Sequence, residues 1–87
     1  MTVTYLAGGD GVRVAYAIGR AVGPAVARNR LRRRLRAAAR EIDSAGPGLS
    51  AGAYLVALRP EAAGLSYAEL RDDLATACAA ASAGSRT

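Results

Sequence analysis

The segment from Ala25 to Glu41 reads AVARNRLRRRLRAAARE, and it restricts the possible fold more than any other part of the chain. Its apolar residues recur at every third or fourth position, which is the spacing of one face of an α-helix. These residues are Ala27, Leu31, Leu35 and Ala38, and Ile42 continues the pattern directly after the segment. Seven arginines fill much of the remaining surface, so the helix must pack through one narrow apolar seam. We expect this helix to run from about Pro24 to Asp43.

Three other segments read as β-strands. Thr2–Ala7 and Val12–Ile18 alternate in polarity or size and are rich in β-branched side chains. The glycine-rich Gly8–Gly11 between them contains Asp-Gly, a signal of a tight turn, and we expect the two strands to form a β-hairpin. After the helix, Ala53–Arg59 is mostly apolar and is followed by Pro60, which predicts a buried strand.

The last part of the chain carries a helix start signal. Ser66 and Glu69 have the spacing of a capping box, in which each side chain bonds the backbone N–H of the other residue. We expect a final helix from there to about Ala81, and a loop at Ser44–Gly52. The element order is β-β-α-β-α, and 87 residues suffice for a single domain, residues 1–87. The predicted fold class is α+β, a two-layer α/β sandwich.

The charge of the chain indicates a polyanionic partner. The net charge is +5, every basic residue is arginine, and no acid occurs between Asp10 and Glu41. Seven like charges repel one another, so a neutralising partner explains the segment better than a solvated surface, which usually mixes both signs. Nucleic acid is favoured over a membrane surface, because the apolar seam is needed against the sheet. The absence of lysine favours planar contacts with phosphates and bases, and a GC-rich genome explains it equally well.

The composition excludes most catalytic chemistry. Without histidine or lysine, the chain can form no Ser-His, Cys-His or Schiff-base site and has no imidazole to bind a metal. Cys78 falls in an alanine-rich helical pattern and is expected to be buried. We therefore expect no catalytic residue, no metal ligand and no small-molecule cofactor bound by the protein alone. No signal peptide and no apolar run of about 20 residues is evident, so we expect a cytoplasmic protein without a membrane partner.

The sequence RNRLRRRLR, at Arg28–Arg36, resembles the RNR signature of the bacterial ribonuclease P protein component family. TVTYLA resembles the first strand of that family, and VAYAIGRAVGPAVARNR resembles its next strand, basic turn and helix entry. AYLVALRPEAAGLSYAELRDDL, at Ala53–Leu74, resembles its last strand and last helix. The resemblance covers nearly the whole chain. It implies a fold like the second domain of ribosomal protein S5, with a left-handed β-α-β crossover.

The resemblance also implies a function, that of a protein cofactor of a ribozyme. In this family the catalytic RNA, with magnesium ions, cleaves the 5′ leader from precursor tRNA, and the protein binds that RNA and the leader. The chain would then be part of an endoribonuclease in which the RNA carries the catalysis. By position, the residues that match the RNA-binding helix and the basic turn before it are Arg20, Arg28, Asn29, Arg30, Arg32, Arg33 and Arg36.

The leader-binding surface is expected on the sheet. Tyr5 matches an aromatic residue on the family's leader-binding face, where a base can stack on the ring. Alternation places Val3 with Tyr5 on one strand, and Ala15 with Ala17 on the other. We expect these four residues to bind the leader together if the strand register brings them to one face. In the alternative, Tyr5 is a core residue covered by a helix.

Several features depart from the family pattern. Family members carry an N-terminal helix before the first strand, and we expect this chain to lack it, because the strand begins at Thr2. Gly19 and Ala21 replace residues that are often serine and basic, and Pro24 stands where a capping side chain is common. The alternative function is a structural RNA-binding protein, such as a ribosomal or RNA-chaperone module, with no role in leader cleavage.

Overall fold

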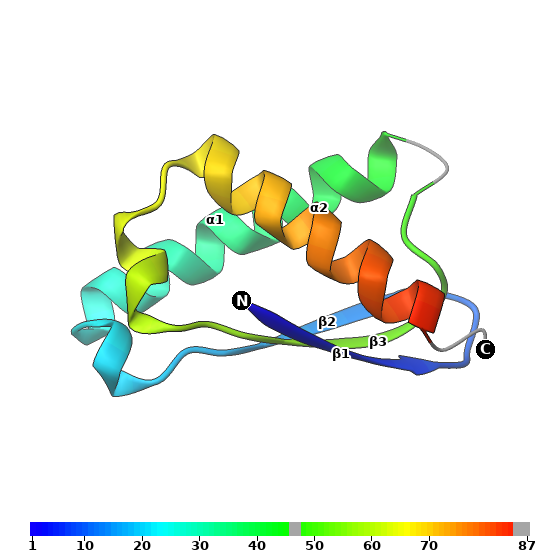
Figure 1. Cartoon of the computed structure of the whole chain (residues 1–87), viewed down its shortest axis with the longest axis horizontal. Coiled ribbons are helices and arrows are strands. Elements are labelled where there is room, and N and C mark those ends of the chain that lie inside the picture. The colour runs from blue at the N-terminus through cyan, green and yellow to red at the C-terminus, as the bar shows by residue number, and fades with distance from the viewer. Residues whose placement is uncertain (46–47, 85–87) are drawn as a thin grey trace.

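The structure is a computed structural model, and it describes residues 1–45 and 48–84. Its elements, in chain order, are β1 (Thr2–Ala7), β2 (Val12–Ala17), the 3-10 helix η1 (Arg20–Val22), α1 (Ala25–Ser44), β3 (Gly52–Ala57), the 3-10 helix η2 (Pro60–Gly64) and α2 (Tyr67–Gly84). The strands form one layer, and both long helices lie across one face of it (Figure 1). This confirms the α+β two-layer fold and the order β-β-α-β-α. Positions 46 and 47 of the expected loop lie outside the described residues.

The strands are arranged in the order β1-β3-β2, so the expected hairpin is wrong. β3 is antiparallel to β1 and parallel to β2, and it occupies the centre of the sheet. β3 is the most apolar strand, and the central place is the one in which both of its edges are hydrogen-bonded. The segment Gly8–Gly11 passes across the end of β3, and the Gly52 N–H donates to the Gly11 carbonyl at 3.0 Å. A four-residue segment can cover the spacing of two strands, about 10 Å.

The connection from β2 through α1 to β3 is a left-handed crossover. In Figure 1 the helices lie above the sheet, β2 and β3 both run from right to left, and β3 is nearer to the viewer than β2. This arrangement is the opposite of the right-handed crossover found in about 98% of such units. The left-handed connection is the one that the family resemblance implied.

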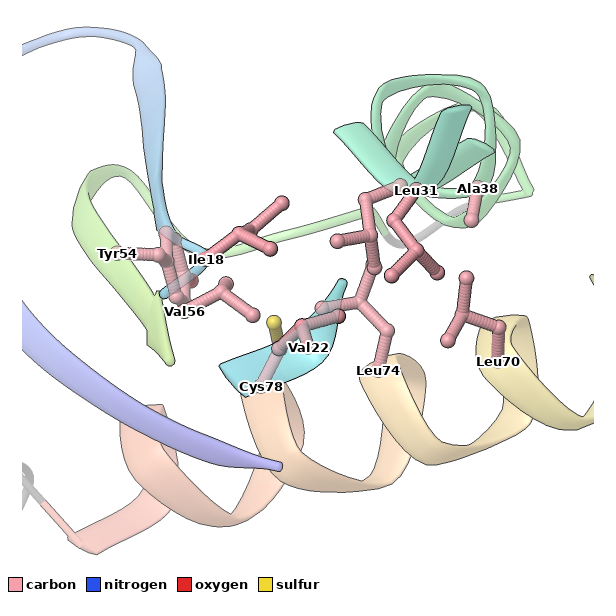
Figure 2. Close-up of a cluster of buried hydrophobic side chains, with 10 residues drawn as sticks. Ile18, Val22, Leu31, Ala38, Tyr54, Val56, Leu70, Leu74 and Cys78 are labelled. Atoms are coloured by element: carbon pink, nitrogen blue, oxygen red, sulfur yellow. The ribbon is translucent and has the colours of Figure 1, made fainter. Parts of the chain in front are cut away.

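The core lies between the sheet and the two helices. Leu31, Leu35 and Ala38 of α1 are buried, which confirms the apolar seam that the spacing predicted. From α2, Leu70, Leu74 and Cys78 point toward α1 and the sheet (Figure 2). Tyr54 and Val56 supply the centre of the sheet, and Ile18 and Val22 close the end near η1. Cys78 is buried as predicted, and this burial raises the pKa of its thiol.

Both long helices pack their apolar side chains into this core. α1 and α2 pack against each other, and α2 also covers β1. Within the described residues, neither helix combines the length and the apolarity that crossing a membrane requires. No described element covers the other face of the sheet (Figure 1). The surfaces left for a partner are therefore the arginine-bearing sides of α1 and this outer sheet face.

Candidate RNA-binding site

The first turn of α1 is positively polarised. The helix starts after Pro24, no side chain caps it, and its first turn contains no acid. The first backbone N–H bonded within the helix is that of Arg28, which donates to the Pro24 carbonyl at 3.0 Å. The N–H groups before it, together with the aligned peptide dipoles, give this end a partial positive charge. The first arginines of α1 therefore lie at an end of the helix whose own partial positive charge already favours a bound anion.

Most of the basic side chains lie on one side of α1. At about 100° per residue, one broad sector beside the buried seam holds seven polar residues, and the last of them, Asp43, accepts a hydrogen bond from the Leu49 N–H at 3.0 Å. We call the other six the arginine face; it consists of Arg28, Asn29, Arg32, Arg33, Arg36 and Arg40. Asn29, Arg32, Arg33 and Arg36 line a hollow of about 530 Å³ on it. The Arg32 guanidinium donates to Asn29 Oδ1 at 3.0 Å, which orders both side chains at the hollow.

The arginine face lies over the side of the sheet that β2 forms. Burial raises the pKa of Tyr16 on β2, and the nearby positive charges of Arg36 and Arg40 partly offset that rise. Arg28 is only partly exposed, and its Nε atom is buried without a hydrogen-bond partner among the described residues. Leaving such a donor unsatisfied is costly, so Arg28 has an unused capacity to bind an acceptor.

The acids near α1 are engaged elsewhere. Glu41, on the side of α1 next to α2, accepts a hydrogen bond from the Tyr67 hydroxyl at 2.9 Å and pairs with Arg71 at 3.1 Å. Arg71 also pairs with Asp72 at 3.4 Å. Over residues 1–45 and 48–84, these are the ion pairs that form, and neither involves an arginine of α1. Within this described part of the chain, none of the seven α1 guanidinium groups therefore forms an ion pair with a carboxylate.

Further basic residues lie near the start of α1. η1 contacts both α1 and η2, which brings the exposed Arg20 to this end of the molecule. Arg59, directly before η2, is exposed at the same end, and the sequence reasoning did not select it. A basic residue at the end of a buried strand, next to a proline, was the signal that could have identified it. Arg13 was missed as well, and it lies on the outer face of the sheet.

The four residues expected to bind the leader do not share one face. β3 separates β1 from β2, and its register aligns Tyr5 with Tyr54 and Tyr54 with Val14. Val3 and Tyr5 therefore face the helices and pack against the core, whereas Ala15 and Ala17 lie on the outer face. The expectation of a shared face is wrong, because the inserted strand sets a register that alternation alone could not specify.

Tyr5 itself is placed as the alternative predicted. Its ring centroid lies 4.8 Å from that of Tyr54, and its hydroxyl donates to the Ala51 carbonyl at 2.6 Å. Gly52 makes room for it, since a Cβ at this position would come within 2.6 Å of the Tyr5 ring. These contacts hold the ring on the helix-facing side of the sheet.

The outer face carries mostly small side chains, and its row at Leu6, Ala53 and Arg13 lines a hollow of about 320 Å³. Its three rows across the sheet are Thr2–Ala57–Ala17, Thr4–Leu55–Ala15 and Leu6–Ala53–Arg13. Arg13 is its one charged residue, and none of these nine residues is aromatic. The face lies on the side of the sheet opposite α1 and has no ring on which a base could stack.

The described residues contain no group of three or more side chains that could hold a metal ion. Together, these features form a positively charged surface on the described part of α1. A family model for ribonuclease P matches residues 1–82 of the chain. The chain belongs to the ribonuclease P family. The RNR signature at Arg28–Arg30 thus lies at the start of the helix that carries the uncompensated charge.

Known members of the family resemble the chain closely. The ribonuclease P protein component of a Nocardioides species is 48% identical over 62 residues, which cover 71% of this chain and 51% of that protein. The same component from Salinispora tropica is 49% identical over 72 residues, which cover 82% of this chain and 51% of that protein. The chain spans about half the length of the curated relatives it matches.

A solved structure supports the fold. The Staphylococcus aureus RNase P protein superposes with a TM-score of 0.72 at 19% sequence identity. The match covers 91% of this chain and 70% of that protein. The shared fold extends over almost all of the residues described for this chain.

Proposed function

We propose that the chain acts as the protein subunit of ribonuclease P, binding the catalytic RNA and the 5′ leader of precursor tRNA to promote 5′ maturation of tRNA. The observation that carries this proposal is the set of seven α1 arginines that form no ion pair with a carboxylate of the described residues, in a member of the ribonuclease P family. The chain contains no histidine and no lysine, which fits a subunit whose RNA partner performs the cleavage. A cytoplasmic location, beside both RNAs, belongs to the same proposal.

The arginine face would act on the phosphate backbone. A guanidinium group can donate two parallel hydrogen bonds to one phosphate, and each neutralised phosphate releases condensed counterions. The partly exposed Arg28 belongs to this face, and Arg32, Arg33 and Arg36 line a hollow on it. Arg20 and Arg30 would extend the contact around the start of α1. Magnesium enters this proposal bound by RNA, because the described residues offer it no cluster of ligands.

For the leader, we place the contact on the part of the outer face that β2 forms. The small side chains of Ala15 and Ala17 allow a single-stranded nucleic-acid backbone to approach the sheet closely, and Arg13 can bind one phosphate. Val3 and Tyr5 would contribute from the opposite side by supporting the sheet. Without an aromatic ring on the outer face, the leader would be held through its backbone, with little preference for base identity.

Reconstitution tests the proposal. The chain is combined with the ribonuclease P RNA of the same genome and a precursor tRNA, and leader release is followed over a series of magnesium concentrations. We expect the chain to raise the cleavage rate most at low magnesium, where RNA charges are least screened. If the chain binds the RNA tightly but leaves the cleavage rate unchanged, it is a structural RNA-binding protein and the proposal is wrong.

A further inference from the structure

Val26, in the first turn of α1, is the most exposed of the large apolar residues that the structure describes. Its exposed fraction is 76%, compared with 73% for Leu6 and 47% for Leu55. At helix spacing its neighbours are Asn29, Arg30 and Arg33, three, four and seven residues farther on. The exposed isopropyl group of Val26 therefore lies next to charged and polar side chains at the positively polarised end of the helix.

The folded chain gives Val26 no structural role. It lies roughly opposite the buried seam of α1, about 150° around the helix from it, and it is absent from the residues packed against the core. β-Branched residues also lower helix propensity slightly. Val26 thus neither fills the core nor favours the helix, whereas an apolar contact with a bound partner would remove its surface from water.

We infer that Val26 makes an apolar contact with an unstacked nucleotide of the RNA whose phosphates Arg30 and Arg33 bind. This inference rests on the proposed RNA binding and specifies its chemistry. In a paired A-form helix the bases are stacked and the narrow major groove excludes side chains. An apolar side chain at a helix tip therefore finds the flat face of a base only where the RNA is unpaired.

Charge complementarity selects RNA over other occupants of this surface. Arg30 and Arg33 lie on the same side of α1 as Val26, and the first turn of α1 has no acid and no capping side chain, so this surface favours a partner with negative charge. A nucleotide carries both a phosphate and an apolar face. One valine is too small an apolar patch for a stable contact with a second copy of the chain.

Salt dependence separates the apolar contact from the ionic ones. Binding of the ribonuclease P RNA alone, without precursor tRNA, is measured at several salt concentrations for the wild type, Val26→Ser, Val26→Ile and Arg30→Gln. We expect Val26→Ser to weaken binding about fivefold, and to do so equally at every salt concentration, because an apolar contact releases no counterions. Val26→Ile should retain binding, and Arg30→Gln should lower the salt slope by about one. Leu6→Ser is the matched control, because Leu6 is equally exposed but distant from α1.

The outcomes distinguish the inference from the proposed function. If Arg30→Gln weakens binding while Val26→Ser equals the wild type, the apolar contact does not exist and the proposed function stands. If the wild type itself shows no salt-dependent binding, the proposed function fails. A change of oligomeric state in Val26→Ser, measured by sedimentation with RNA affinity unchanged, would assign the valine to a protein contact and overturn the inference.

The nucleotide can be located directly. A benzophenone-bearing residue placed at position 26 is irradiated in the complex, and the crosslinked nucleotide is read by primer extension. We expect crosslinks at unpaired nucleotides. Crosslinks confined to paired stems would refute the contact with an unstacked nucleotide. A melting curve of each variant checks the fold, which should be unchanged because the side chain is exposed.

Discussion

Replacing Arg32, Arg33 and Arg36 together by glutamine removes the three guanidinium groups that line the hollow on α1. None of them pairs with a carboxylate among the described residues, so each is free to neutralise one phosphate. The measured slope of log affinity against log salt changes by about 0.9 per phosphate on a duplex and about 0.7 on a single strand. The triple variant should therefore have a salt slope that is shallower by about 2 to 3.

This change is large enough to measure with confidence. Between about 50 and 200 mM salt, a difference of 2 to 3 in slope alters the ratio of wild-type to variant affinity by about 16- to 64-fold. Fluorescence anisotropy with labelled ribonuclease P RNA gives both affinities over this range. The variant should bind more weakly than the wild type at low salt and approach it at high salt.

Arg71→Gln is the matched control for this experiment. Arg71 is also a helical arginine, but Glu41 and Asp72 already neutralise it, and they raise its pKa further. Its replacement should leave the salt slope nearly unchanged. If the triple variant keeps the wild-type slope, or if Arg71→Gln changes it equally, net charge rather than the arginine face governs binding and the reasoning is refuted.

Three further results are expected. Leu35→Ala, at a fully buried position in the seam of α1, should lower the free energy of unfolding by about 2–5 kcal/mol in urea titrations; a loss below about 1 kcal/mol would contradict the proposed packing. Tyr5→Ala should lower the melting temperature and weaken binding of precursor and mature tRNA equally, since the ring packs on Tyr54 on the helix-facing side of the sheet. A loss of affinity confined to precursor tRNA would show that Tyr5 contacts the leader. Hydrogen bonds from Ser66 lower the pKa of Glu69. The ionised carboxylate therefore stabilises the fold at any pH above the usual pKa of glutamate, and this stabilisation is lost as the pH falls through the lowered pKa. Glu69→Gln should remove that part of the acid dependence in melting curves recorded from neutral to acid pH, and an unchanged curve would show that the cap contributes nothing.

The features that the sequence determined by itself are those set by neighbours a few residues apart. The spacing of Leu31, Leu35 and Ala38 identified the buried side of α1, because helix geometry alone decides which residues share a face. The capping box formed as expected, with the Ser66 N–H donating to Glu69 and the Glu69 N–H donating to Ser66 Oγ. The family resemblance added the strand-helix-strand connection and its left-handed sense.

What only the tertiary structure decided depends on partners far apart in the chain. The insertion of β3 between β1 and β2 joins residues about 40 or more positions apart, and no local pattern encodes which residues of these strands pair with one another. That insertion fixed the register, and the register turned Tyr5 toward the core while leaving Ala15 on the outer face. The pairing of Glu41 with Arg71, 30 residues away, likewise left the arginines of α1 uncompensated. Charge and periodicity are local properties that can be read along the chain, whereas the face that a strand exposes and the acid that an arginine meets are set by packing between distant segments.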